Sequence, residues 1–263
     1  MAVRKGQVGF RAEKTHRIEP ILRCTVLEPA LLQTALALAE ISVLDGCELS
    51  LSLLDDGVEA VVHGLASPDY GALQDLADIA DQLDLARLSY RHRREEPLPI
   101  AHRREGLVRF GDVPVVVPAA PFLQATRQGE AYLRDRVEEW LTSADRVADL
   151  FCGCGAFALP LVTQRPERRV MAIDRDGPAI SALSQAGRAA GLEGRLVCET
   201  GDLSADPLSG SALDGFDGVV FDPPRAGARA QAEALAASTV KDVVAVSCNP
   251  SSFARDAAIL LAG

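Results

Sequence analysis

Residues 244–250 combine an apolar, strand-like run with a cysteine and the start of a helix. The run reads Val-Ala-Val-Ser-Cys-Asn-Pro, and Asn249 and Pro250 are favourable as the N-cap and first residue of a helix. A thiol beside a helix N-terminus is stabilised as the thiolate by the helix dipole. Because a thiolate is a strong nucleophile, Cys248 is a candidate covalent catalyst. For a cysteine taken alone, a buried structural role is the alternative.

Four carboxylates also lie at or near the ends of strand-like runs in this half of the chain. We expect strands at 146–151, 168–174, 195–200, 217–222 and 243–248, with helical segments between them. Such alternation predicts an α/β fold with a parallel sheet and helices on both faces. In these folds, ligands bind outside the carboxyl ends of the strands. The side chains expected there are Asp149, Asp174, Asp202, Asp222 and Cys248.

A glycine turn follows the first of these strands, within 146–160, which reads RVADLFCGCGAFALP. Gly153 and Gly155 allow a tight turn and the close approach of a ligand. With Ala158 in third place the pattern fits a dinucleotide site, and Asp174 lies at a suitable distance to bind a ribose. A P-loop is excluded because no Gly-Lys-Ser/Thr follows the glycines.

S-adenosylmethionine (SAM) also needs a glycine turn and an acid for its ribose, but it carries no pyrophosphate. Asp149, just before the glycines, would repel phosphates and would suit a cationic sulfonium. We therefore expect SAM as the cofactor, with a nicotinamide dinucleotide of a Rossmann oxidoreductase as the alternative.

Three segments in this order, DLFCGCGAFALPL, FDPPRAGA and SCNPSSFARD, resemble the SAM-dependent RNA uracil-5-methyltransferases, which make 5-methyluridine in 23S rRNA and tRNA. The segment 121–124, Pro-Phe-Leu-Gln, resembles the Phe-x-Gln segment of that family. The resemblance covers roughly 120–260 and, more loosely, 8–30. It implies a Rossmann-like class I SAM methyltransferase domain preceded by a smaller α+β domain.

The resemblance also implies roles for individual residues. Cys248 would add to C6 of the uracil, which makes C5 nucleophilic enough to attack the sulfonium methyl, and a base would then remove the C5 proton. Asp222 would face the target base and so counts as catalytic. Together with the glycine turn, the positions expected around the cofactor are Gln124, Asp149, Phe151, Gly153, Gly155, Ala156, Asp174, Asp202 and Asp222.

The chain departs from the family at both ends. The family's base is the glutamate of a His-x-Glu that should follow the last helix, whereas this chain stops at Gly263. Cys24 resembles the last ligand of an iron–sulfur cluster present in part of the family, and the other three cysteines are absent. We therefore expect a fragment of a longer protein, incomplete at its C-terminus, with a naturally minimal protein as the alternative. An iron–sulfur cluster would belong to a full-length form. A SAM-binding or RNA-binding fragment without turnover is the alternative to an active enzyme.

Composition sets the broad class. The chain has 263 residues, of which 48% are hydrophobic, and no apolar run long enough to span a membrane. The six cysteines do not form a disulfide framework, which favours a reducing cytoplasm. Cys152 and Cys154 have no second Cys/His pair beside them, so we assign them to the loop backbone rather than to a metal. We expect a monomer with no membrane partner.

The net charge of −10 is unusual for a protein that binds RNA. Basic residues nevertheless cluster on either side of the stretch 25–86, which has none. If the two clusters meet in space, they form an RNA-facing stripe, and Cys24 favours rRNA over tRNA as the partner. The clusters are Arg4, Lys5, Arg11, Lys14, Arg17 and Arg23, and then Arg87, Arg91, Arg93, Arg94, Arg103, Arg104 and Arg109.

The first half is expected to form an α+β domain over 1–118, followed by the methyltransferase domain over 119–263. Helical spacing predicts helices at 29–44 and 71–86, and a further helix at 126–141. Alternation around Asp55-Asp56-Gly57 predicts a hairpin of strands 48–54 and 58–63. Strand-like pieces over 87–117 are broken by Pro97, Pro99, Gly111 and Pro114.

Overall fold

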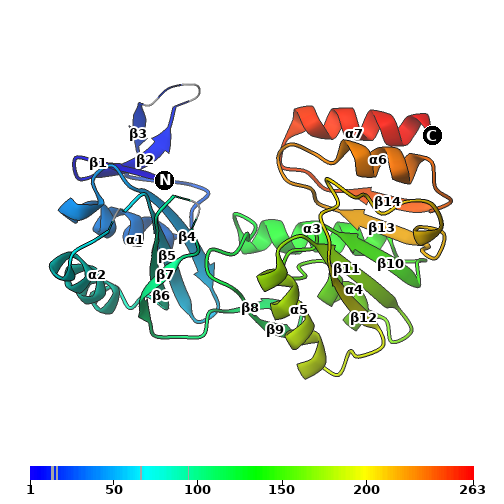
Figure 1. Ribbon diagram of the computed structural model, residues 1–263, viewed down its shortest axis with the longest axis horizontal. Coiled ribbons are helices and arrows are strands. Elements are labelled where there is room, and N and C mark those ends of the chain that lie inside the picture. Colours follow the sequence, from blue (N-terminus) through cyan, green and yellow to red (C-terminus); the bar gives the residue numbers. More distant parts are fainter. Residues whose placement is uncertain (13–14, 16, 66, 94) are drawn as a thin grey trace. The chain divides into compact units, whose positions relative to one another are not determined.

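The chain folds into two compact units in the computed structural model (Figure 1), which describes all residues except 13–14, 16, 66 and 94. Unit 1 contains Met1–Val108 and Val116–Arg127, and unit 2 contains Arg109–Val115 and Gln128–Gly263. Each unit is described by itself, and the predicted domain division between 118 and 119 stays a prediction. Lys14 and Arg94 of the expected basic clusters lie outside the described residues.

Unit 1 is built on a seven-stranded sheet with the order β3-β2-β1-β4-β5-β6-β7. Its pairs are antiparallel except β5 with β6, and the expected hairpin pairs Glu48 with His63. Helices α1 (Pro29–Ala39) and α2 (Tyr70–Gln82) pack on the face that carries Leu49, Ala60 and Leu88. The strands are β1 (Ala2–Arg4), β2 (Gln7–Arg11), β3 (Ile18–Pro20), β4 (Glu48–Leu54), β5 (Gly57–His63), β6 (Arg87–Arg91) and β7 (Leu98–His102).

Both helices of unit 1 are shorter than expected. After α1 the chain becomes extended at Ile41 and forms a short 3-10 turn over Ser42–Leu44. The β-branched residues in this stretch disfavour an α-helix, and the turn buries Leu44 completely. The helix predicted to run to 86 ends at Gln82, because Asp84 takes a positive φ of 50° that redirects the chain into β6.

Two prolines expected to break strands lie within strands instead. Pro99 lies in β7, which is the edge of the seven-stranded sheet, and Pro114 lies in β9 (Val113–Val116), which pairs only with β8 (Leu107–Phe110) among the described strands. An edge strand has backbone N–H groups that face away from any partner, so a proline there removes no ladder hydrogen bond.

Unit 2 confirms the predicted parallel sheet. Its five strands have the order β12-β11-β10-β13-β14, and every pair is parallel. The strands are β10 (Arg146–Leu150), β11 (Arg169–Asp174), β12 (Leu196–Thr200), β13 (Gly218–Phe221) and β14 (Asp242–Ala245). The helices are α3 (Arg127–Trp140), α4 (Ala158–Gln164), α5 (Gly177–Ala189), α6 (Arg229–Ala236) and α7 (Pro250–Ala262).

The chain first adds strands on one side of β10 and then, starting with β13, on the other side, so the direction in which the sheet is built reverses between β10 and β13. Connections lead from β10 towards β12 on one side and from β13 to β14 on the other. Since such connections are right-handed, α4 and α5 cover one face of the sheet and α6 covers the other, where α7 contacts α6. The point of reversal is where α/β sheets of this kind bind ligands.

The last strand ends three residues earlier than expected, at Ala245 rather than 248. Val246 still donates its backbone N–H to the Phe221 carbonyl, at 2.9 Å. The Ser247 hydroxyl then accepts the Asn249 N–H at 3.2 Å, which turns the chain away from the sheet. Cys248 therefore lies in a loop between β14 and α7.

No helix within the described part of the chain is long and apolar enough to cross a membrane.

Candidate active site

The carboxyl edge of the unit 2 sheet brings the predicted acids to neighbouring positions. Asp174 is the last residue of β11, and Asp222 directly follows β13. Asp202 comes two residues after β12, and Asp149 is the penultimate residue of β10. Because β11, β10 and β13 are adjacent and parallel, three of these carboxyl groups lie at one edge, around the point of reversal.

Asp149 is a fully buried acid at the centre of this edge. Neither carboxylate oxygen has a well-formed hydrogen bond to a described residue. Burial raises the pKa of Asp149 well above its ordinary value, the nearby Ala158 N–H offsets part of this, and Asp222 and Asp174 raise it further. The direction of this shift is towards the neutral acid, which weakens the argument that a charge at this position selects SAM over a dinucleotide.

The glycine turn has an unusual backbone. Phe151, Gly153 and Gly155 have φ angles of 64°, 52° and 94°. A left-handed conformation is strained for phenylalanine, and such strain is concentrated at functional sites. The N–H groups of Phe151 and Cys152 both donate to the Ile173 carbonyl, at 2.9 and 3.1 Å, which holds the turn across the end of β11.

The two glycines face different surroundings. A Cβ atom built on Gly153 would meet no atom within 4 Å, whereas one on Gly155 would lie 2.4 Å from Leu183 Cδ1. Gly155 therefore allows the turn to pack on α5, and Gly153 borders open space. Ala156, which follows in the turn, is half-buried.

Asp174 is tied to the glycine turn. Its Oδ2 accepts the Gly153 N–H, and its Oδ1 accepts the Asp176 N–H, both at 2.9 Å. Asp202 is exposed, and its Oδ1 accepts the Ser204 N–H at 3.0 Å. Each carboxylate keeps acceptor capacity for a ligand hydroxyl, because an oxygen can accept more than one hydrogen bond.

Asp222 lies half-buried at the end of β13, beside the central strand. Its N–H donates to the Leu150 carbonyl at 3.3 Å. Burial raises the pKa of Asp222 to about 6. This side chain therefore changes charge close to neutral pH, as general acids and bases of active sites do.

Cys248 is the exposed member of the six cysteines, all of which the structure describes. Asn249 is the N-cap of α7 as predicted, and its Oδ1 accepts the Ser251 N–H at 3.1 Å. Burial raises the pKa of the Cys154 thiol to about 12 and that of Cys198 to about 11. Burial also raises the pKa of Cys152 well above its ordinary value. Accessibility therefore distinguishes Cys248 from these thiols.

Two of the predicted site residues belong to unit 1. Gln124 is half-buried in the segment after β9, and its role at the cofactor stays a prediction. Cys24 lies in the loop before α1, where its Sγ accepts the Leu27 N–H at 3.4 Å. No group of three or more His, Cys, Asp or Glu side chains in the described ranges could hold a metal ion, so a single thiol stands here without further ligands.

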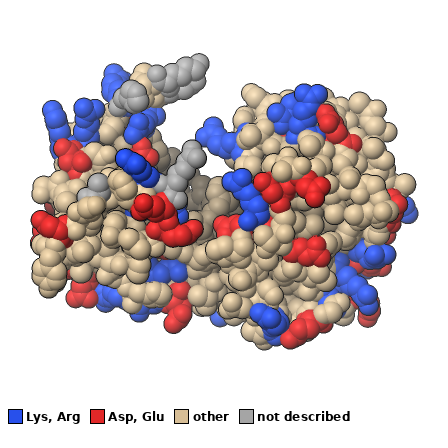
Figure 2. All heavy atoms as spheres, viewed as in Figure 1, with Lys and Arg blue, Asp and Glu red and all other residues tan. Residues whose placement is uncertain are grey.

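Several arginines expected to face RNA are engaged within the protein. Arg87 is 7% exposed and pairs with Glu59 at 2.8 Å. Arg103 and Arg104 pair with Asp84, Arg103 also pairs with Asp81, and Arg11 and Arg17 pair with Glu48 and Glu19. In Figure 2, basic and acidic side chains are interspersed over the visible face. The expectation that Arg87 faces RNA is therefore wrong, because burial against Glu59 occupies it.

One arginine from each basic cluster lies at the same end of the unit 1 sheet. Arg11 pairs with Glu48, Glu48 lies opposite His63, and His63 lies opposite Arg91 on β6. Burial lowers the pKa of His63, and the nearby Arg91 lowers it further. This arrangement joins an arginine from each cluster on one polar sheet face.

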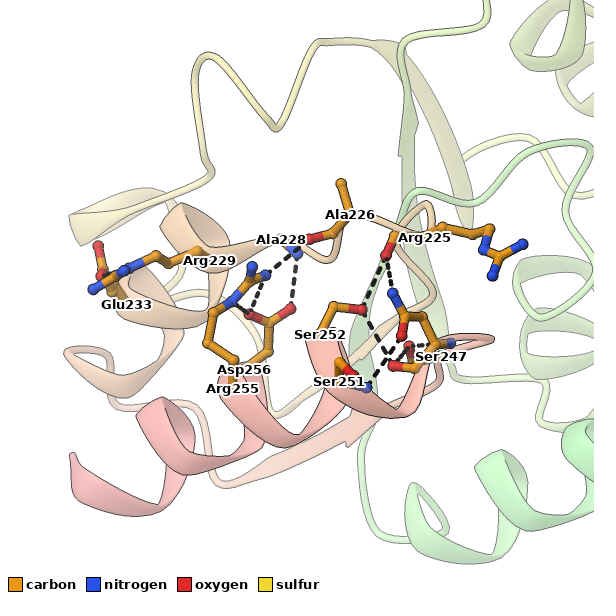
Figure 3. Close-up of polar contacts among 11 residues, drawn as sticks. Arg225, Ala226, Ala228, Arg229, Glu233, Ser247, Ser251, Ser252, Arg255 and Asp256 are labelled. Carbon is orange, nitrogen blue, oxygen red and sulfur yellow. Dashed lines mark hydrogen bonds and ion pairs between the residues drawn. The ribbon is translucent and has the colours of Figure 1, made fainter. Parts of the chain in front are cut away.

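The sequence interpretation missed a second feature of α7. Its first two turns contact the loop that follows Asp222, through Asn249, Ser252, Arg255 and Asp256 (Figure 3). A pocket of about 320 Å³ opens beside this loop. The positions 249, 252 and 255–256 recur at helical spacing, so the pattern could have indicated one contact face.

Comparisons with known proteins find that the chain is similar to methyltransferases. Residues 128–246 match the family model described as Methyltransferase small domain. An uncharacterized RNA methyltransferase of Brucella suis is 37% identical over 97% of this chain and 61% of its own length. One of Mesorhizobium japonicum is 47% identical over 62% of this chain and 39% of its own length.

A third relative has a more specific name. The 23S rRNA (uracil(1939)-C(5))-methyltransferase RlmD of Shewanella sp. is 29% identical over 97% of this chain and 59% of its own length. This chain thus spans about three fifths of the length of the Brucella and Shewanella relatives. Residues 128–246, which contain the Rossmann-like parallel sheet, therefore match a methyltransferase family model, in a chain that is similar over nearly its whole length to proteins named as RNA methyltransferases.

Proposed function

We propose that this protein methylates C5 of a uridine in RNA, using SAM and a covalent bond from Cys248 to C6. The observation that carries the proposal is the exposed Cys248 thiol at the start of α7, in the loop next to Asp222. The strands that precede these residues, β13 and β14, are paired neighbours. A nucleophile and a titratable acid thus follow adjacent strands at the edge that binds ligands.

The residues of the glycine turn suit SAM. Gly153 leaves open space where a ligand can approach the backbone, and Asp174 and Asp202 supply carboxylates for hydroxyl and amino groups. The buried, unpartnered Asp149 offers acceptor atoms that a bound ligand would satisfy. When bound, SAM would supply an electrophilic methyl group on a cationic sulfur.

The protein side chains would supply the rest of the chemistry. The Cys248 thiolate adds to C6 of uracil, and the electron pair of the C5–C6 bond moves into the ring as an enolate. C5 then attacks the methyl carbon, the bond from that carbon to sulfur breaks with its electron pair left on the sulfur, and S-adenosylhomocysteine is the leaving group. A base removes the C5 proton, and the thiolate leaves as the C5–C6 double bond re-forms. The half-buried Asp222, with a pKa of about 6, is the side chain that we propose contacts the target base.

The proposed substrate is RNA, and rRNA in preference to tRNA. The RlmD relative carries the name of a uracil-C5 enzyme of 23S rRNA. Arg91, on the polar face of the unit 1 sheet, supplies a cationic group for phosphates. An iron–sulfur cluster stays a prediction for a full-length form, since the described residues contain no group of three or more His, Cys, Asp or Glu side chains that could hold a metal ion.

The test is methyl transfer from isotopically labelled SAM to 23S rRNA and tRNA transcripts, followed by nucleoside mass spectrometry. We expect labelled 5-methyluridine in rRNA and none with Cys248→Ser. Cys198→Ser is the matched control, because this thiol is half-buried with a raised pKa. Labelled product on another nucleoside, or equal product from Cys248→Ser, would overturn the proposal.

A further inference from the structure

The loop after Asp222 is fastened to the helix that follows Cys248 by side chains on one face of α7. Asn249 Nδ2 and Ser252 Oγ both donate to the Arg225 carbonyl, at 2.8 and 3.1 Å. One turn later, Arg255 Nη2 donates to the Ala226 carbonyl at 3.0 Å. Figure 3 shows the Ser252 and Arg255 side chains on the side of α7 that faces the backbone of the loop.

Asp256 completes this set of contacts from a buried position. It is 3% exposed, and its Oδ2 accepts the Ala228 N–H at 2.8 Å. Its Oδ1 accepts the Arg255 Nε–H at 2.8 Å, so the two side chains orient each other. A hydrogen bond to a buried carboxylate is among the stronger ones in a protein.

The loop itself is shaped to lie against this face. Gly227 has a φ of 76°, and its N–H donates to the Pro224 carbonyl at 2.7 Å. A Cβ atom on Gly227 would lie 2.4 Å from both Arg255 Nη2 and Asp256 Oδ2, so only glycine allows the approach. The backbone and α7 are thus in direct contact.

The contacts join the two groups on which the proposed chemistry depends. Asp222 is separated from Arg225 only by Pro223 and Pro224, whose fixed φ angles make the link stiff. Cys248 is directly followed by Asn249, which binds the same Arg225 carbonyl. A displacement of the loop would therefore be transmitted to both the carboxyl and the thiol.

We propose that Arg255 and Asp256 are positioning residues that fix Asp222 relative to Cys248. The effect on catalysis rests on the proposed function, whereas the hydrogen-bonded link between the loop after Asp222 and α7 does not. The neighbouring pair Arg229–Glu233 lies beside the same pocket and is hydrogen-bonded within α6, at 2.8 Å. It provides a matched control for the loss of a nearby charge pair.

The first measurement is hydrogen exchange by mass spectrometry on Asp256→Ala. We expect amides of 225–228 and of 247–252 both to exchange at least about tenfold faster, because a buried charged hydrogen bond is lost. Exchange in 151–156 should not change, and Arg229→Gln should match the unmodified chain. Faster exchange in 225–228 alone would show that the loop and the start of α7 are not linked through Asp256. If Asp256→Ala does not fold, Ser252→Ala removes a single contact to the same loop.

The second measurement is steady-state methyl transfer. We expect Asp256→Ala to lower kcat by roughly tenfold to a hundredfold, as a small misplacement of reacting groups does, while KM for SAM stays within about twofold. Asp256→Asn keeps an acceptor for the Ala228 N–H and should restore most of kcat. An unchanged kcat would overturn the positioning role. A wild-type chain that transfers no methyl would instead refute the proposed function. The exchange data would still show whether Asp256 links the loop to α7.

Discussion

The same substitution at the two glycines of the turn should damage two different properties. Gly155→Ala places a Cβ atom 2.4 Å from Leu183 Cδ1 and 3.3 Å from Leu159 Cγ, and both leucines are fully buried. Overpacking of this kind costs about 1–3 kcal/mol, and the φ of 94° adds about 1–2 kcal/mol for a residue with a Cβ. We expect a loss of about 2–5 kcal/mol in the free energy of unfolding.

Gly153→Ala should instead leave the fold nearly intact. Its φ of 52° lies in the left-handed region open to other residues, and its Cβ would meet no atom. The cost is about 1 kcal/mol, part of which the stiffer unfolded chain offsets. Because the Cβ enters the space where we propose that SAM approaches, affinity for the demethylated product S-adenosylhomocysteine should fall more than about tenfold, or about 1.4 kcal/mol.

Denaturant unfolding and calorimetric titration of both variants measure these two effects, at a temperature where Gly155→Ala is folded. The expected pattern is a stability loss for Gly155→Ala with affinity within about threefold of wild type, and the reverse for Gly153→Ala. If Gly153→Ala binds S-adenosylhomocysteine as tightly as wild type, the ligand does not approach this glycine and the assignment of the turn is wrong.

Three further predictions concern single charged groups. Asp174→Ala should lower SAM affinity by roughly 1.5–3 kcal/mol in calorimetry, since a charged hydrogen bond to the ribose is lost, and an unchanged affinity would refute that contact. Asp222 has a pKa raised from 3.8 to about 6, so its contribution to stability is full below about pH 3.8 and is lost as pH rises through 6. Asp222→Asn should therefore raise the free energy of unfolding by about 1–3 kcal/mol at pH 8 and leave it unchanged at pH 3.5. Equal effects at both pH values would refute the argument that burial raises the pKa of Asp222. Arg91→Glu should weaken RNA binding and reduce the slope of log affinity against log salt concentration by about 1. Arg103→Glu should change this slope less, because Arg103 is already paired with Asp81 and Asp84. An RNA affinity that does not depend on salt would show that RNA does not bind this face.

The alternation of strand-like and helical segments was sufficient to predict the sheet of unit 2, because buried parallel strands are nearly continuous apolar runs. Val147, Val170 and Val219 lie in such runs, and each is buried in the observed sheet. Helix ends in unit 1 were less predictable. The end of α1 depends on burial of Leu44 and that of α2 on the positive φ at Asp84, and neither shows in an apolar period.

The site residues that follow strands could be found from sequence, because the chain brings each strand end to one edge. The protonation preference of Asp149 could not, since it depends on complete burial between two other carboxyl groups. The burial of Arg87 could not be predicted from the sequence either. Its partner Glu59 is 28 positions away and reaches it only through the parallel pairing of β5 with β6.

The most direct test of the central claim is covalent capture of Cys248. The chain is incubated with SAM and an RNA transcript containing 5-fluorouridine, in which fluorine replaces the C5 proton and blocks release of the thiol. Peptide mass spectrometry should locate the RNA adduct on Cys248, and Cys248→Ser should form none while Cys198→Ser forms as much as wild type. An adduct on another cysteine, or no adduct with the wild-type chain, would contradict covalent catalysis by Cys248.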